Sequence, residues 1–233
     1  MVGGGGIGRA LVADLAERAP ALELVMTSRS PQPPDLATRV RVLAVDLASD
    51  QSLQGLRESL TGGAPLRLVV CCAGLLHAPD LQPEKRLAQV RRSALERSFA
   101  VNAFGPLLLA QALEPLLPRD LPFHFASLSA RVGSIGDNRL GGWYAYRAAK
   151  AAQNQLLHTL ALEWRRRLPL ACVSLMHPGT TATSLSGPFQ GSVPPERLFS
   201  PRRAASQLLD VLERLTPEQS GQFWAWDGQP IPW

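Results

Sequence analysis

Tyr146 and Lys150 are the residues of this sequence whose types and spacing best suit proton-transfer chemistry. They lie four positions apart in a run whose apolar residues recur every three or four positions, so both belong to one face of a predicted helix. A phenol titrates near pH ~10, but a neighbouring ammonium stabilises the phenolate and lowers the pKa of the phenol. The pair can therefore act as a general acid or base. A half-buried structural tyrosine beside a solvated lysine would have the same spacing. The rest of the chain must therefore distinguish a catalytic pair from a structural one.

Apolar segments typical of buried strands alternate with amphipathic segments along the chain. Strands are expected at 22–27, 40–45, 66–72, 123–128, 171–176 and 222–226. Helices are expected after the glycine-rich start and at 52–60, 94–117, 143–167 and 202–215. The last helix has Ser200 as its N-cap and Pro201 at its first position. This order predicts an α/β fold of the Rossmann type, a doubly wound parallel sheet with helices on both faces, in one domain over 1–233.

Composition describes an ordinary globular chain. It has 233 residues, 45% of them apolar and 18% charged, and a net charge of +5. The basic run 165–167 is expected to complement a helix dipole rather than to bind nucleic acid. Three cysteines and four histidines show no disulfide or metal-ligand spacing, so no metal is expected. No membrane segment and no targeting signal are recognised, so we expect a cytoplasmic protein.

Candidate binding residues follow the predicted strands. The glycines at 3–6 and Gly8 run into a helix, a pattern whose amides can meet a phosphate. In parallel sheets, ligands bind beyond the carboxyl ends of the strands. Polar or small residues stand at these ends, namely Ala73, Gly74, Ser127, Ser129, His177, Pro178 and Gly179. The loop at 180–199 follows the same edge and is expected to form a lid, whose Leu185, Phe189 and Val193 suggest an apolar pocket.

Taken in this order, the motifs resemble the short-chain dehydrogenase/reductase (SDR) family of the classical type over almost the whole chain. The resembling residues are Gly4, Gly6, Ile7 and Gly8, Asp46 and Leu47, Ala73 and Gly74, Asn102, Ser129, Tyr146 and Lys150, and Pro178, Gly179, Thr181 and Thr183. The segments 73–77, 129–134, 137–143 and 227–233 are similar to C-factor-like members of that family, which are named after a cell-signalling protein.

The resemblance implies hydride transfer between a nicotinamide and a carbonyl or alcohol. Tyr146 would be the general acid or base, and Lys150 would lower the pKa of Tyr146 and hold the ribose hydroxyls. Ser129 would donate to the substrate oxygen and Asn102 would support the proton path. The remaining residues of the resemblance would bind the cofactor. A homodimer or homotetramer is also implied. The alternative is a non-catalytic, dinucleotide-binding signalling or regulatory protein of C-factor type.

The residues that follow the second strand of a Rossmann sheet indicate which cofactor is preferred. In this chain that strand corresponds to the one expected at 22–27. A carboxylate there binds ribose hydroxyls and repels a 2′-phosphate, whereas an arginine pairs with that phosphate. This chain has Thr27, Ser28 and Arg29 there, with no carboxylate. We therefore expect NADP(H) to be favoured over NAD(H), although Arg29 could be an ordinary loop cation.

Two departures from the family pattern stand out. Val2 replaces the first glycine of the motif, and the strand that should precede it is missing or truncated. Its loss is expected to leave an open hydrophobic slot in the sheet and to weaken cofactor binding, unless the start lies upstream of Met1 or the fold compensates. Ser129 also lies far from Tyr146, with a glycine-rich excursion between them. We prefer Ser129 to Ser127 and Ser134, and Tyr146 to Tyr144.

Overall fold

A computed structural model describes residues 3–29 and 40–233 of the chain. Val2, which departs from the glycine motif, lies outside the described residues. The helices are α1 (Gly6–Arg18), α2 (Asp50–Leu60), α3 (Arg92–Phe99), α4 (Gly105–Leu113), α5 (Tyr144–Arg167) and α6 (Pro201–Leu212). The strands are β1 (Leu24–Ser28), β2 (Val40–Ala44), β3 (Leu68–Cys71), β4 (Phe123–Leu128), β5 (Ala171–His177), β6 (Thr180–Thr181), β7 (Leu198–Phe199) and β8 (Gln222–Ala225).

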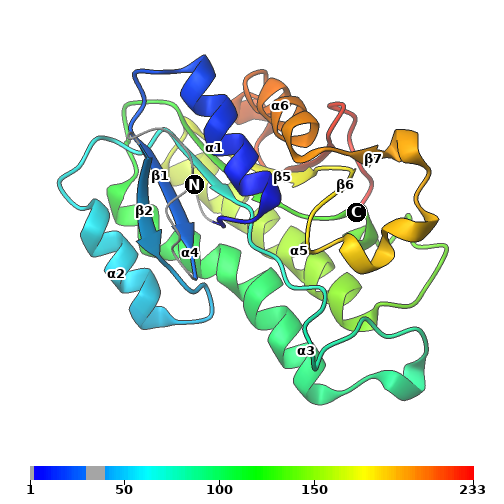
Figure 1. The fold of residues 1–233 in the computed structure, drawn as a ribbon. Coiled ribbons are helices and arrows are strands. Elements are labelled where there is room, and N and C mark those ends of the chain that lie inside the picture. The colour runs from blue at the N-terminus through cyan, green and yellow to red at the C-terminus, as the bar shows by residue number, and fades with distance from the viewer. Residues whose placement is uncertain (1–2, 30–39) are drawn as a thin grey trace.

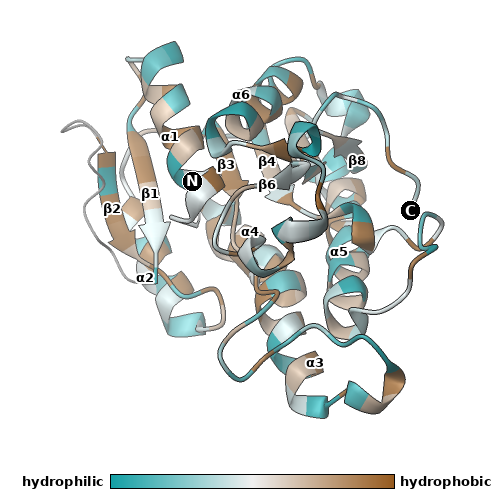
Figure 2. Cartoon of the chain, turned by 45° about the vertical axis from the view of Figure 1, so that its right-hand side comes forward, coloured by the Kyte–Doolittle hydropathy of each residue, from teal (hydrophilic) through white to brown (hydrophobic). Residues whose placement is uncertain are grey.

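The strands are parallel and are covered by helices on both faces, as predicted (Figure 1). One set is ordered β3-β4-β5-β8, and β1 pairs with β2. Alternate residues of each strand face opposite helical layers, as a pleat requires. In β3, Val69 packs in the core with α2, α4 and α5, whereas Val70 packs with α1 and α6. Hydrophobic residues accordingly concentrate on the strands (Figure 2).

Local sequence signals set several element boundaries. Ser200 Oγ accepts a hydrogen bond from the backbone N–H of Arg203 at 3.2 Å and Pro201 opens α6, which confirms the predicted start. Ser49 caps α2 in the same way, through the N–H of Ser52, so α2 begins two residues earlier than expected. The charged end of α5 is held by Arg167, which pairs with Glu163 and Glu114.

The expected single helix at 94–117 is interrupted. Between α3 and α4 the backbone forms a π-helical segment, Ala100–Phe104, and a 3₁₀ turn, Glu114–Leu116, ends the run. In the π-helical segment each backbone hydrogen bond spans one residue more than in an α-helix, so the side chains there point in other directions than a regular helix would give. Such segments are frequent at functional sites. By length and hydropathy alone the whole run, Arg92–Leu116, would suffice to cross a membrane, contrary to expectation, but in this fold it packs against α2 and α5.

The segment expected as an irregular lid contains two short strands. β6 pairs with β7 in parallel, and 3₁₀ turns at Gly187–Ser192 and Pro195–Arg197 lie between them. The backbone N–H of Ala182 also donates to the carbonyl of Phe199 at 2.8 Å. These hydrogen bonds tie the two ends of the segment together, so the part between them projects as a closed loop.

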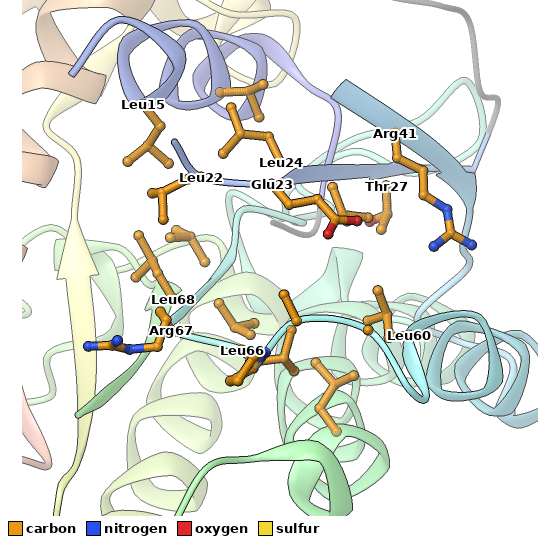
Figure 3. A pocket seen from close by; sticks show the side chains of 18 of the residues that line it. Leu15, Leu22, Glu23, Leu24, Thr27, Arg41, Leu60, Leu66, Arg67 and Leu68 are labelled. Carbon is orange, nitrogen blue, oxygen red and sulfur yellow. The ribbon is translucent and has the colours of Figure 1, made fainter. Parts of the chain in front are cut away.

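The hydrophobic slot predicted from the missing first strand is present. Within the described residues no strand ladder joins β1 to β3, and a cavity of about 520 Å³ lies between them. Leu22, Leu24, Leu66 and Leu68 line it from the two strand segments, and Leu15 of α1 and Leu60 of α2 close its faces (Figure 3). The described residues therefore form a Rossmann-like fold in which β1 and β3 are not paired directly.

Candidate functional site

A second cavity of about 440 Å³ lies at the carboxyl ends of the strands. It joins the glycine-rich loop, the ends of β1, β2, β3 and β4, and the first turns of α5. Of the predicted site residues, those lining it are Gly4, Gly6, Ile7, Gly8, Ser28, Arg29, Asp46, Leu47, Ala73, Gly74, Ser129, Tyr146, Lys150, Pro178 and Thr183. The topology therefore brings together residues that are spread over most of the sequence.

The glycine-rich loop is shaped for close approach of backbone to backbone. Gly3 has φ of +104°, and a Cβ there would lie 2.9 Å from the backbone nitrogen of Ala73. A Cβ on Gly6 would lie 2.8 Å from the side chain of Thr183. The N-cap residue of α1 is Gly5, which has no side chain to accept from the first backbone N–H groups of the helix. These N–H groups are therefore accessible to a ligand. This geometry suits a phosphate group, because the N-terminal amides and the helix dipole attract anions.

Two charged residues line the cavity beside the glycine-rich loop. Arg29 follows β1 and is exposed, and Asp46 lies just beyond β2. Asp46 Oδ1 accepts from the N–H of Ala48 at 3.0 Å, and the N–H of Asp46 donates to Ser52 Oγ at 2.9 Å. Thr27 Oγ1 accepts from the N–H of Gly3 at 3.2 Å, which links the end of β1 to the glycine-rich loop. The site therefore fits a dinucleotide along its length.

Asn102 does not line this cavity. It instead binds the backbone of Leu75, which does line it. It is fully buried in the π-helical segment. Its Oδ1 accepts from the N–H of Leu75 at 2.8 Å, and its Nδ2 donates to the carbonyl of Leu75 at 2.7 Å and to Ser98 Oγ at 3.1 Å. The amide thus fixes the backbone that follows β3. In this structure its contacts are positional, and the proton path expected from the resemblance stays a prediction.

Tyr146 and Lys150 share the buried face of α5, as their spacing predicts. Burial raises the pKa of Tyr146 and lowers the pKa of Lys150 to about 8. Lys150 Nζ lies 5.8 Å from the centre of the Tyr146 ring and donates to the carbonyl of Leu128 at 2.7 Å and to Gln153 Oε1 at 2.9 Å. Burial thus shifts the pKa of the phenol upward, opposite to the lowering expected from the spacing, and the ammonium is bonded to Leu128 and Gln153.

Ser129 is buried and its hydroxyl donates to Asn154 Oδ1 at 2.6 Å. Of its two rivals, Ser127 is also buried and accepts from Gln153 Nε2, and Ser134 accepts from the N–H of Asp137. Only Ser129 of the three lines the cavity. Tyr144, the rival of Tyr146, is 41% exposed and does not line it either. The preferred residues are thus the ones that the fold places at the site.

Two predicted residues of the last motif lie away from the cavity. Gly179 has φ of +74° and packs against Phe199, where a Cβ would be 2.5 Å from the ring. Thr181 is buried, and its Oγ1 lies 3.3 Å from the carbonyl oxygen of Gly179. Pro178 and Thr183, on either side, do line the cavity. The first and last residues of the motif therefore line the cavity, and the two between them hold the turn.

Three polar residues that contact the site were missed by sequence reasoning. Gln153 and Asn154 continue the buried face of α5 and bind Lys150 and Ser129. Glu84 is 3% exposed, and its Oε2 accepts from the N–H of Ala145 at the start of α5. Positions three, four, seven and eight after a helical residue share its face, so the two α5 residues had a detectable signal. Glu84 had none, since it is distant in sequence.

No cluster of metal-ligating side chains occurs among residues 3–29 and 40–233. The fit of the cavity to a dinucleotide rests on the glycine-rich loop, the uncapped helix terminus and the length of the site.

Comparisons with known proteins agree with this geometry. The 1-hydroxy-2-glutathionyl-2-methyl-3-butene dehydrogenase of a Rhodococcus strain is 33% identical over 192 residues, covering 81% of this chain and 78% of that protein. C-signal of Myxococcus xanthus is 33% identical over 148 residues, covering 63% of this chain and 83% of that protein.

Solved structures resemble the whole chain. An NADPH-bound carbonyl reductase from chicken fatty liver superposes with a TM-score of 0.86 at 23% identity, covering 100% of this chain and 97% of that one. The carbonyl reductase Sniffer of D. melanogaster superposes with the same TM-score of 0.86 at 25% identity and with the same coverage of 100% and 97%. The sequence model of the family described as "short chain dehydrogenase" matches residues 1–191 of this chain. The chain therefore belongs to the short-chain dehydrogenase family of oxidoreductases.

Proposed function

We propose that this protein is an NADP(H)-dependent carbonyl reductase or alcohol dehydrogenase whose general acid or base is Tyr146. The observation that carries the proposal is one continuous cavity, lined at one end by the glycine-rich loop and at the other by Ser129, Tyr146 and Lys150. Hydride-transfer enzymes need the cofactor and the proton donor to meet the same substrate carbon and oxygen. A single cavity with both sets of groups meets that requirement.

In the direction of reduction, Tyr146 gives its hydroxyl proton to the carbonyl oxygen. A nicotinamide held by the residues of this cavity would supply the hydride for the carbonyl carbon, so that the product is an alcohol and the cofactor is oxidised. The raised pKa keeps the phenol protonated at neutral pH, so it is ready to donate. Ser129 donates to the same oxygen after its hydroxyl turns from Asn154, and Lys150 holds the ribose hydroxyls and supports the phenolate until it regains a proton from solvent.

Replacing Tyr146 by phenylalanine tests the proton donor. We expect Tyr146→Phe to lower kcat/KM for carbonyl reduction by about 10²- to 10⁴-fold, the range for loss of a general acid, with NADPH binding retained. The matched control is Tyr144→Phe, since Tyr144 is the other tyrosine of the chain and is 41% exposed. Equal activity of Tyr146→Phe and the unmodified protein would refute the assignment.

The cofactor preference is proposed from Arg29. Its guanidinium follows β1 at the end of the cavity away from Tyr146, where it can pair with a 2′-phosphate. We expect Arg29→Ala to weaken NADPH binding by about 10-fold and to leave NADH binding nearly unchanged, because a charge-assisted hydrogen bond contributes roughly 1.5–3 kcal/mol. Tryptophan-to-nicotinamide energy transfer measures both affinities, and exposed Arg86→Ala is the control. Equal loss for both cofactors would contradict the preference.

A second candidate function is a dinucleotide-binding signalling or regulatory protein that turns over little substrate. It is favoured by the resting contacts of Lys150 and Ser129, which are directed to Gln153 and Asn154 rather than to Tyr146, and by the likeness to C-signal. Saturable NADPH binding with no reduction of a broad panel of carbonyl compounds would support it. Reduction that depends on Tyr146 would favour the enzyme.

The remaining parts of the proposal concern the assembly and its surroundings. We propose a small-molecule carbonyl or alcohol as the only substrate class, a homodimer or homotetramer, and a cytoplasmic location without nucleic-acid or membrane partners. Light scattering coupled to size-exclusion chromatography measures the mass of the assembly against the 25.2 kDa chain. A monomer at micromolar concentration would overturn the oligomer.

A further inference from the structure

The phenol of Tyr146 belongs to a cluster of four ring side chains that come from three separate segments. The centroids of the Trp143 and Phe189 rings are 5.0 Å apart with the planes tilted by 57°, and the Trp143 and Tyr146 centroids are 6.3 Å apart. His77, in the loop after β3, lies 5.9 Å from Phe189, and its Nε2 is 3.1 Å from the carbonyl oxygen of Ser184. The cluster therefore connects the segment between β6 and β7 to the start of α5.

The backbone of Trp143 is held in an unusual conformation. Its φ of 53° and ψ of 44° are left-handed, and within residues 3–29 and 40–233 no other non-glycine residue has a positive φ. Gly141 and Gly142, just before it, also have left-handed φ values. A bulky side chain costs about 1–3 kcal/mol in this region, so such residues persist where the surroundings over-determine them, often at ligand sites. A tryptophan stands where a third glycine would relieve the strain.

Glu84 is the group that holds Trp143 in place. Its carbonyl oxygen accepts from the N–H of Trp143 at 2.5 Å, and its Oε2 accepts from the N–H of Ala145 at 3.2 Å. The side chain of Glu84 is buried and lies at the positive end of the α5 dipole, where a carboxylate is stabilised. The indole of Trp143 is thereby fixed at the amino end of α5, one turn from Tyr146.

The ring cluster meets the cavity at Tyr146, and its other rings lie outside the lining. The charged groups bonded to the backbone around Trp143 are Glu84 and Arg147. The charged side chains that line the cavity are Arg29, Asp46 and Lys150. The first two follow β1 and β2, and the ammonium of Lys150 is bonded to Leu128 and Gln153. The segment that carries Phe189 contributes Thr183, Ser184 and Leu185 to the lining, all uncharged. The substituent of a substrate that extends past Tyr146 on this side therefore meets uncharged side chains and the rings of Trp143 and Phe189.

We propose that the site selects carbonyl compounds that carry an uncharged aromatic ring, and that Trp143 and Phe189 are its specificity-determining residues. This inference rests on the function proposed above. Both rings are half-buried, so each has surface left for a ligand. Aromatic pairs prefer offset or edge-to-face packing at centroid separations of about 4.5–7 Å, the range already spanned within the cluster. A ligand ring packed on Trp143 and Phe189 extends that arrangement while its carbonyl oxygen meets Tyr146.

The test compares two ketones that differ only in the aromaticity of one ring. Phenylacetone and cyclohexylacetone have the same carbon skeleton, and neither carbonyl is conjugated with its ring. We measure kcat/KM with NADPH, and the dissociation constant of each ketone from the protein saturated with NADP⁺ by calorimetry. We expect phenylacetone to be favoured by about 2- to 12-fold in both quantities, the factor that corresponds to one aromatic pair.

Trp143→Gly and Phe189→Leu should each reduce this ratio towards one. Glycine at 143 keeps the left-handed backbone accessible, so this variant removes the ring without demanding a new fold. Phe104→Leu is the control, because Phe104 is 50% exposed and contacts Phe99 away from the cluster. A ratio of one in the unmodified protein, or a ratio that survives both cluster substitutions, overturns the inference. An aromatic preference in binding that both substitutions abolish, without turnover of either ketone, supports the inference and refutes the proposed enzyme.

Discussion

The buried ammonium of Lys150 makes a prediction about stability that does not depend on catalysis. Lys150 is 1% exposed, and its burial lowers the pKa from 10.5 to about 8, against a smaller opposing effect of Cys71. Nζ donates to the carbonyl of Leu128 and to Gln153 Oε1. Lys150→Met keeps an unbranched apolar stem and removes the titrating group. The pH dependence of the difference in unfolding free energy then reports on this one side chain.

The direction follows from proton linkage. In the unfolded chain the lysine keeps its proton up to its ordinary pKa, whereas the folded chain releases it near pH 8, so the folded state gains stability as pH rises between these two values. Integration gives about 0.1 kcal/mol at pH 7, about 0.4 at pH 8 and about 1.4 at pH 9. The unmodified protein should therefore gain about 1 kcal/mol over Lys150→Met between pH 8 and pH 9.

Other buried groups oppose this gain at higher pH. Burial raises the pKa values of Cys71, Cys72 and Tyr146, so the unfolded chain loses those protons first and stability falls above the ordinary pKa of each. Both proteins carry Cys72 and Tyr146, so the comparison with Lys150→Met cancels these two. Cys71 interacts with Lys150, which lowers the pKa of the thiol, so the same comparison also contains this smaller effect. The interval from about pH 7 to about pH 9 is therefore the informative one.

Urea unfolding of the cofactor-free protein at about pH 7, 8 and 9, at constant ionic strength, measures the three free energies. Lys85→Met is the matched control, since Lys85 is the other lysine of the chain and is exposed. Its difference from the unmodified protein should not change with pH. A constant difference for Lys150→Met as well would show that Lys150 keeps its ordinary pKa when folded, and would refute the desolvated position.

Further substitutions test how the site is supported. Asn102→Ala should destabilise the protein by about 1–3 kcal/mol in urea unfolding, because the part-buried backbone N–H and C=O of Leu75 lose their buried partner. A loss below about 0.5 kcal/mol contradicts this. Gly133→Ala should cost about 1–3 kcal/mol and lower activity, since a Cβ there lies 2.8 Å from Lys150 Cβ; unchanged melting shows that α5 can move. Ser200→Ala should cost about 1 kcal/mol through loss of the α6 cap, and Ser206→Ala gives the comparison within the same helix.

Much of the fold could be predicted because its signals are local. Strand and helix alternation is visible in the spacing of apolar residues, and a parallel sheet follows from continuous apolar strands. The start of α6 is predicted by Ser200 and Pro201, and the shared face of Tyr146 and Lys150 follows from a spacing of four.

The hydrogen-bond partners of the site residues and the pKa of Tyr146 were decided by tertiary structure. The sequence specifies that Ser129 and Lys150 face the cavity, but the hydrogen bonds that they make are chosen among side chains that packing brings within about 3 Å. Gln153 binds Lys150 and Asn154 binds Ser129. Desolvation raises the pKa of Tyr146, whereas the spacing to Lys150 had predicted a lowered value. Burial is a property of the whole fold, so no local pattern contains it.

Trp143 shows the same division. Its neighbours Gly141 and Gly142 indicate a turn before α5, and that much is local sequence. Its left-handed backbone depends on hydrogen bonding to Glu84, about sixty positions earlier, and its indole meets Phe189, which follows it by more than forty. Periodicity and turn chemistry determined where the elements begin and end. Contacts between distant segments, which the sequence does not encode locally, decided which side chains surround the phenol of Tyr146.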